Sequence, residues 1–324
     1  MKRLIKILAV IAALLVIAFI ALRTPDTDPA EMRAKYGGEP SQFVSLANGQ
    51  TVHLRDEGPR DAPAIVFLHG SNADLHTWQP WVDGLKDNYR VIRFDQVGHG
   101  LTGADRDGDY SLDGYVADID ALAQTLGLDS FILGGSSMGG GHTLAYAMAH
   151  PEKLAGLVLV DASGAPRVVP EDQDEGGNIG FTIARTPIVN KVMEHITPRS
   201  LVAQSFAQSV SNQEIVTEEA IDRYWELLRY PGNRTATIAR FGRDYEPFSP
   251  SQLAALDMPA LIVWGTEDAL IPLESGRWLD QQLPHSTLAE YSGIGHLPQE
   301  EAPVETLADL REWLLTLDLA GQGA

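Results

Sequence analysis

Short apolar runs of strand length alternate with helical runs along most of this 324-residue chain. Several of the strand runs are apolar throughout, as expected of a sheet that helices cover on both faces. At 112–126, apolar residues recur every three or four positions, which marks one face of a helix. Strand and helix in alternation predict parallel βαβ units and therefore an α/β fold. The expected strands are 43–46, 51–54, 64–69, 91–95, 131–133, 154–161, 260–264 and 287–291.

The alternation stops between about residues 164 and 258. This stretch opens with an acidic run at 171–175 and continues with helical segments such as 217–229, where Thr217 can cap the helix. Strand runs then resume, and 304–315 is expected to be a closing helix. The predicted organisation is an α/β core at 41–164 and 259–317, a helical cap inserted at 165–258, a linker at 24–40 and a tail at 318–324.

The first 23 residues differ in character from the rest of the chain. Lys2, Arg3 and Lys6 precede an uninterrupted apolar run at 7–22, which is shorter than the roughly 20 residues of a full membrane span. No pair of small residues with the A-x-A-like spacing of a signal-peptidase site ends the run. We therefore predict an uncleaved N-terminal anchor, with a cleaved signal peptide as the alternative. The basic residues should stay in the cytoplasm, which places the body across the membrane, or secretes it after cleavage.

Net charge and cysteine content exclude several classes of function. The whole chain carries a formal charge of −20, and the part after residue 23 carries −24, because four of the 24 basic residues and none of the 44 acidic ones precede it. Such a field repels phosphate backbones, so no nucleic-acid partner is expected. The absence of cysteine removes disulfides, thiolate metal sites and cysteine nucleophiles.

The stretch ILGGSSMGGGH at 132–142 places two adjacent serines after an apolar strand run. A serine becomes a nucleophile only when a base can take its proton and a rigid bend exposes it to substrate. In the strand–turn–helix motif G-x-S-x-G, glycines two positions before and after the serine let strand and helix approach closely. Glycines occupy both positions around Ser137, whereas Ser136 has Met138 at one of them. Ser137 is the predicted nucleophile, and a plain glycine turn is the alternative that this motif alone leaves open.

Three further strand ends carry groups that such a serine needs. Gly70 after the third strand run permits a tight turn, so the backbone N–H groups of Ser71 and Met138 are predicted to form an oxyanion hole. Asp268 and His296 follow the last two strand runs. With the serine they give the chain order Ser, Asp, His, in which the aspartate orients the histidine and the histidine acts as base.

With these motifs in place, the chain resembles the α/β-hydrolase superfamily over about residues 41–317, close to its esterase, lactonase and carbon–carbon hydrolase branches. DQVGHGLT at 95–102 matches the family's D-x-x-G-x-G-x-[ST] loop, and the insertion at 165–258 falls where the family places its cap. The resemblance implies a mostly parallel sheet covered on both faces. A serine at 137 argues against the dehalogenase and epoxide-hydrolase branches, which have an aspartate there.

Other titratable residues compete for the same roles. Asp161 ends another strand run, a position that some relatives use for the triad acid, and Glu267 adjoins Asp268. A surface-loop histidine is the alternative for His296. In the predicted cap, Met193, Tyr224 and Trp225 are weak candidates for the pocket wall. Three other histidines lie within motifs and are expected to be structural or to line the pocket: His69, His99 and His142.

No cofactor and no metal are expected. GHGLTG at 98–103 has the G-x-G-x-x-G spacing of a dinucleotide site, but a polar loop follows it instead of a helix, and Asp118 lies inside a predicted helix. The aspartates at 105, 107 and 109 alternate like the start of a calcium loop, yet the glycine comes one position too early and position 116 is valine.

The predicted function is a serine hydrolase that cleaves a small, uncharged or apolar carboxylic ester through an acyl-enzyme intermediate. Lactonase, thioesterase, perhydrolase and carbon–carbon hydrolase activities use the same triad and remain open. A non-catalytic, membrane-tethered binding protein is the alternative of another class. The expected partners are a small ester-like substrate and, through the N-terminal segment, a membrane; the sequence leaves the oligomeric state open.

N-terminal sequencing of the protein purified from membranes tests the predicted anchor. We expect the sequence to begin at residue 1 or 2, because the apolar run lacks a cleavage site. A soluble form that begins shortly after residue 22 would instead identify the segment as a signal peptide.

Overall fold

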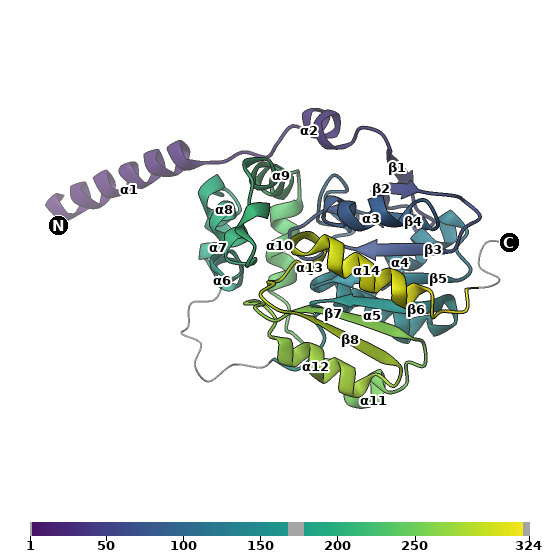
Figure 1. The fold of residues 1–324 in the computed structure, drawn as a ribbon. Coiled ribbons are helices and arrows are strands. Elements are labelled where there is room, and N and C mark those ends of the chain that lie inside the picture. The colour runs from purple at the N-terminus through teal and green to yellow at the C-terminus, as the bar shows by residue number, and fades with distance from the viewer. Residues whose placement is uncertain (1, 168–177, 320–324) are drawn as a thin grey trace.

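The computed structural model describes residues 2–167 and 178–319, and its centre is an eight-stranded sheet (Figure 1). The strands lie in the order β1-β2-β4-β3-β5-β6-β7-β8. Both pairings of β2 are antiparallel and all other pairings are parallel. The strands are β1 Ser41–Ser45, β2 Thr51–Glu57, β3 Ala64–Leu68, β4 Arg90–Phe94, β5 Phe131–Ser136, β6 Leu154–Val160, β7 Ala260–Gly265 and β8 Ser286–Tyr291. This confirms the predicted α/β class with a mostly parallel sheet.

Helices cover both faces of the sheet, as the apolar strand runs predicted. In β3, Val66 and Leu68 join the core on one face, while Ile65 and Phe67 join the core on the other. This alternation follows from the two-residue period of a strand, with both faces buried. One face carries α4 Leu112–Leu126, α5 Met138–Ala149, α11 Pro250–Leu253 and α12 Leu273–Gln282. The other carries α3 Gln79–Leu85 and α14 Pro303–Leu314, with the short α13 Pro298–Glu301 beside them.

In the described part of the segment between β6 and α11, five α-helices lie beyond one end of the sheet (Figure 1). We call them the insertion helices: α6 Ile179–Arg185, α7 Val189–Met193, α8 Arg199–Ala207, α9 Glu218–Leu228 and α10 Asn233–Phe241. Helix α9 begins as its sequence predicts, because Thr217 Oγ1 accepts a hydrogen bond from the N–H of Ala220. The acidic run at 171–175 lies outside the described residues.

The insertion is tied to the sheet layer by a buried ion pair. Arg223 of α9 donates to Asp74, 3.2 Å away, in the loop after β3. Burial would raise the pKa of Asp74, but the charges of Arg223 and His76 outweigh it and hold that pKa well below its usual value. The pair therefore joins α9 to the loop that follows the carboxyl end of β3.

The expected linker contains a helix that sequence analysis did not predict. Asp28 accepts hydrogen bonds from the N–H groups of Ala30 and Glu31, which starts α2 Pro29–Tyr36. Met32 of this helix is buried against Leu101 and residues of the insertion. A proline at the first helical position and an aspartate before it are the local signals for this start.

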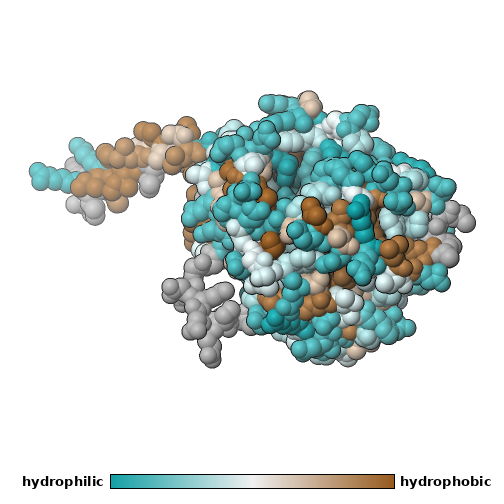
Figure 2. Space-filling view, viewed as in Figure 1, coloured by the Kyte–Doolittle hydropathy of each residue, from teal (hydrophilic) through white to brown (hydrophobic). Residues whose placement is uncertain are grey.

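The N-terminal helix α1 Lys2–Leu22 projects away from the body (Figure 1). None of the described residues of Ile5–Leu22 is buried by the rest of the chain. By length and composition, the helix is long and apolar enough to cross a membrane. Figure 2 shows this apolar surface as a brown rod beside a largely hydrophilic body. The segment after α1 docks on the insertion, where the N–H of Thr24 donates to His195 O at 2.8 Å. The base of α1 therefore lies against the insertion helices.

Candidate active site

Ser137 occupies a sharp bend between β5 and α5, with φ 53° and ψ −117°. A Cβ added at position 135 would collide with the backbone of Gly139, and one at 139 would collide with the carbonyl oxygens of Leu68 and His69. Both motif glycines are therefore needed for strand and helix to pass this closely. Ser136 is the last residue of β5 and is fully buried, and its Oγ has no hydrogen-bond partner among the described residues. Ser137 lines the cavity described below, whereas Ser136 is not among its lining residues.

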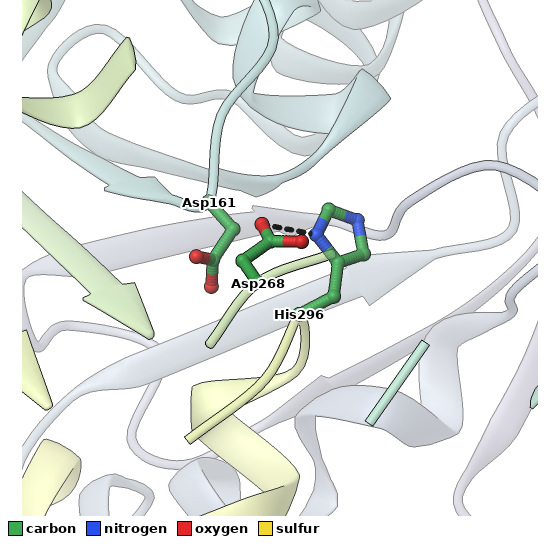
Figure 3. A group of neighbouring side chains, drawn as sticks. All are labelled: Asp161, Asp268 and His296. Carbon is green, nitrogen blue, oxygen red and sulfur yellow. Dashed lines mark hydrogen bonds and ion pairs between the residues drawn. The ribbon is translucent and has the colours of Figure 1, made fainter. Parts of the chain in front are cut away.

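Asp268 and His296, which lie 28 positions apart in the sequence, are joined in the loops after β7 and β8 (Figure 3). His296 Nδ1 lies 2.7 Å from Asp268 Oδ2. The other carboxylate oxygen of Asp268 accepts hydrogen bonds from the N–H groups of Leu270 and Ile271. Both side chains of the pair are buried. The aspartate is thus held by its own loop and can orient the imidazole through Nδ1.

Ser137, His296 and Ser71 all line one cavity. Within the described ranges, no hydrogen bond links Ser137 Oγ to His296, a bond that in unliganded enzymes often forms only with substrate. Ser71 follows Gly70, and a Cβ at position 70 would come within 3.1 Å of Ser137 Cβ. Met138 is the first residue of α5, so its N–H has no partner within the helix. The N–H groups of Ser71 and Met138 therefore belong to backbone that borders Ser137.

Comparison with known proteins decides the family. The model of the alpha/beta hydrolase fold matches residues 63–303, which is most of the chain. The protein belongs to the α/β-hydrolase family. This confirms the resemblance that the motifs at 95–102 and 135–139 carried.

Individual relatives are hydrolases and a peroxidase of moderate identity. The chain is 29% identical to a non-heme chloroperoxidase of Streptomyces lividans over 78% of this chain and 92% of that protein. It is 26% identical to a bifunctional esterase/perhydrolase of Acinetobacter calcoaceticus over 80% of this chain and 95% of that protein. Its fold matches a meta-cleavage product hydrolase of Pseudomonas fluorescens with a TM-score of 0.73, at 22% identity over 85% of this chain and 97% of that one.

Asp161, the rival acid, lies beside the Asp268 carboxylate in this hydrolase (Figure 3). It follows β6 with φ 42°, and its Oδ1 accepts a hydrogen bond from the N–H of Gly265. No recorded hydrogen bond in the described chain joins it to His296, and its Oδ2 has no partner there. Burial and the negative charge of Asp268 raise the pKa of Asp161 well above its usual value. Asp161 therefore holds its proton more tightly than an ordinary carboxyl group, and it lies beside the carboxylate that holds the histidine.

Glu301, which sequence analysis missed, holds the loop that carries the histidine. Its Oε2 accepts hydrogen bonds from the N–H groups of Gly295, Ser211 and Asn212, and its Oε1 accepts one from Leu297. The residues on both sides of His296 are thus tied to one buried carboxylate, and so is the turn of the insertion that follows α8. An acidic residue in the first turn after His296 was the available signal, but two of its four partners, Ser211 and Asn212, lie about 90 positions away.

The remaining candidates occupy structural positions around the cavity. Glu267 is exposed and contacts Ser211 Oγ, so it does not reach His296 as an acid would. Tyr224 lines the cavity, whereas Trp225 Nε1 donates to Thr197 O. The side chain of Met193 lies outside the described part of the structure. Three buried histidines hydrogen-bond to neighbouring backbone or to Gln96: His69, His99 and His142.

The cavity has a volume of about 150 Å³ and lies between the nucleophile and the insertion helices. Its walls are mainly aliphatic and aromatic, with polar groups both around Ser137 and where the segment after α1 contacts Thr197 and Arg234. A cavity with this lining suits a small apolar ligand that a few polar groups orient. The apolar wall is formed by Phe181, Ile183, Leu201, Val202, Phe206, Leu228, Ile238, Leu270 and Leu297.

Replacing each aspartate by asparagine distinguishes the two carboxyl groups. We expect Asp268→Asn to lower turnover of a short-chain ester about ten-thousand-fold, because the imidazole loses its orienting anion. Asp161→Asn mimics the neutral form and should keep turnover within a few-fold. Because the folded-state pKa of Asp161 is raised, the contribution of this one group to wild-type stability falls as pH rises from about 4. The free energy of unfolding of Asp161→Asn, relative to wild type, should therefore increase from pH 4 to pH 7.

Ester turnover and urea unfolding at several pH values are the measurements. If Asp161→Asn lost as much turnover as Asp268→Asn, Asp161 would be the triad acid and the assignment of Asp268 would be wrong.

Proposed function

We propose that this hydrolase cleaves small, apolar carboxylic esters through an acyl-enzyme intermediate on Ser137. The observation that carries the proposal is that the strained serine and the Asp268-bound histidine open onto the same apolar cavity. Esterases among its relatives support the proposal, and the carbon–carbon hydrolase fold that it shares is compatible with it.

In the proposed first step, His296 Nε2 takes the proton of Ser137 Oγ while Oγ bonds to the ester carbonyl carbon. The carbonyl oxygen becomes an oxyanion, and the N–H groups of Ser71 and Met138 donate hydrogen bonds to it. Asp268 accepts the hydrogen bond from Nδ1 and stabilises the imidazolium. The imidazolium then gives its proton to the alcohol oxygen as the carbon–oxygen bond breaks, which leaves the acyl group on Ser137.

In the second step, water releases the acyl group. His296 Nε2 takes a proton from the water as its oxygen bonds to the acyl carbon, and a second oxyanion forms in the same hole. The intermediate collapses, the bond to Ser137 Oγ breaks, and the imidazolium returns the proton to Oγ. The enzyme is restored and a carboxylic acid leaves, so atoms and charge balance over the cycle.

The chemistry of the cavity favours a neutral substrate. Arg234 is the one arginine among the described lining residues, and it is already paired with Asp26 at 2.7 Å. A carboxylate in the substrate would therefore find no free arginine on the cavity wall. Among the activities that share the triad, this favours simple esters and lactones over substrates that carry a second acidic group.

The N-terminal helix supports a place for the reaction at a membrane. Arg234 and Thr197, which line the cavity, both hydrogen-bond to Thr24 just after α1. If α1 is a membrane anchor, this end of the cavity lies close to the lipid surface. Two exposed apolar residues of α7, Val189 and Val192, and Ile188 before it, belong to the same insertion. We propose that the substrate is an ester that partitions into the membrane.

Replacing Ser137 by alanine tests the nucleophile. We expect Ser137→Ala to abolish hydrolysis of p-nitrophenyl butyrate and labelling by a fluorophosphonate probe, because both require attack by Oγ. The matched control is Ser136→Ala, which removes a buried hydroxyl that lacks a partner among the described residues. This control should be labelled and should turn over substrate within a few-fold of wild type.

Labelling that persists in Ser137→Ala would overturn the assignment. A wild-type protein that neither reacts with the probe nor hydrolyses esters would favour the non-catalytic binding protein.

A panel of p-nitrophenyl esters, lactones, thioesters and diketones tests the substrate class. We expect the uncharged short-chain esters to give the highest kcat/KM, and an ester with an added carboxylate to be at least ten-fold poorer. The reason is that an unpaired carboxylate would be desolvated against the apolar wall. Preference for the anionic member of a matched pair would contradict the proposed substrate class.

A further inference from the structure

Arg240 differs from Arg223 and Arg234, two other arginines of the insertion, in what its guanidinium contacts. Arg223 and Arg234 each pair with an aspartate, at 3.2 Å and 2.7 Å. Arg240, in the last turn of α10, donates instead to neutral atoms: NH1 to His99 Nε2 and to Met138 Sδ at 3.2 Å, and NH2 to Thr237 Oγ1 at 3.1 Å and to Asn72 Oδ1 at 3.3 Å. Over the part of the chain that the structure describes, Arg240 forms no ion pair.

Among the described residues that it contacts, the buried Arg240 guanidinium carries the one positive charge. Burial and the charge of Arg240 lower the pKa of His142 to about 3, and the same two causes lower the pKa of His99. His99 accepts from Arg240 through Nε2, which leaves Nδ1–H to donate to Val97 O. These imidazoles are therefore neutral near pH 7, while an arginine keeps its proton. A buried cation without an anion is unusual, because desolvating an unpaired charge is costly.

The contacts of Arg240 fall on both segments that carry the predicted oxyanion donors. Met138 donates one of the two N–H groups, and Arg240 holds its side chain at Sδ. Asn72 follows Ser71, whose backbone N–H is the second predicted donor. Asn72 has φ 59°, and its Oδ1 accepts hydrogen bonds from both Arg240 and Thr237 of α10. One side chain of the insertion thus joins the turn after β3 to the start of α5, next to Ser137.

We propose that Arg240 is a positioning residue of the oxyanion hole: it holds the two donor segments together and places an uncompensated positive charge behind them. The inference rests on the proposed function. Negative charge develops on the substrate oxygen only in the transition state, so a fixed cation nearby favours that state over the neutral ester. The water-excluded surroundings preserve the effect, because the interaction is little screened there.

Arg240→Met in the full-length protein tests this assignment. We expect kcat for p-nitrophenyl butyrate to fall roughly 10- to 100-fold while KM stays within about two-fold, because the neutral ground state gains little from the charge. The affinity for phenylboronic acid, which forms an anionic tetrahedral adduct on a serine, should fall by a similar factor. Arg240→Lys should recover part of both losses, because it restores the charge but not the forked hydrogen bonds.

The matched control is Arg243→Met, which removes an exposed cation three residues further on. It should leave kcat, KM and boronate affinity unchanged. An unchanged kcat in Arg240→Met, or a loss confined to KM, would overturn the proposal. A loss of kcat with undiminished boronate affinity would also overturn it, since a positioning role in the oxyanion hole must affect both.

Asn72→Asp keeps the inference testable if Arg240→Met does not fold. The new carboxylate preserves the acceptor at the same position but neutralises the guanidinium, so kcat should again fall at least ten-fold with a native unfolding midpoint. Wild-type kcat in this variant would refute the role of the charge.

Fluorophosphonate labelling separates the proposal for Ser137 from the proposal for Arg240. A wild-type protein that is not labelled would refute Ser137 as the nucleophile. Labelled wild type with an equal labelling rate in Arg240→Met would refute the role of Arg240 alone.

Discussion

The backbone of Ser137 lies in a region of conformational space that strains any residue with a side chain, and the rest of the site depends on holding it there. The neighbouring strand supplies the restraint. The N–H of Ser137 donates to Val160 O, and its carbonyl oxygen accepts from the N–H of Ser163, each at 2.9 Å. The glycines at 135 and 139 remove the side chains that would keep β5 and α5 apart. These hydrogen bonds and close contacts hold Ser137 in its strained conformation, in which its side chain lines the cavity.

The insertion and the catalytic loops form one hydrogen-bonded unit. The N–H of His296 donates to Ser209 O, and Glu301 binds N–H groups on both sides of the histidine as well as those of Ser211 and Asn212. Arg240 connects the insertion to Met138, which follows Ser137, and to Asn72 in the turn after β3. An insertion that only covered the cavity would not need such contacts. We infer that its position affects the geometry of the base and of the oxyanion donors together.

The local parts of this site could be predicted from the sequence because each depends on few neighbouring residues. Glycine spacing distinguished Ser137 from Ser136, and the strand ends indicated Asp268 and His296. The sheet class followed from apolar runs that alternate with helical periodicity. These features are encoded within about ten residues, so no knowledge of distant contacts was required.

The non-local parts could not be predicted in the same way. Asp161 looked like a competing acid, and only its burial beside Asp268, which raises its pKa, distinguishes the two carboxyl groups. Glu301, Asn72 and Arg240 obtain their roles from partners that lie up to 168 positions away. Helix α2 was missed because its buried face meets the insertion and the loop after β4, although its capping signal was present.

The central claim is that an ester's acyl group passes through Ser137. Peptide mass spectrometry of wild-type protein, acid-quenched during turnover of p-nitrophenyl butyrate, measures this directly. We predict one butyryl group on the peptide that contains residues 136 and 137, absent in Ser137→Ala, with a burst of p-nitrophenol equal to the number of active sites. Turnover without a burst and without an adduct, or an adduct on another residue, would contradict the account.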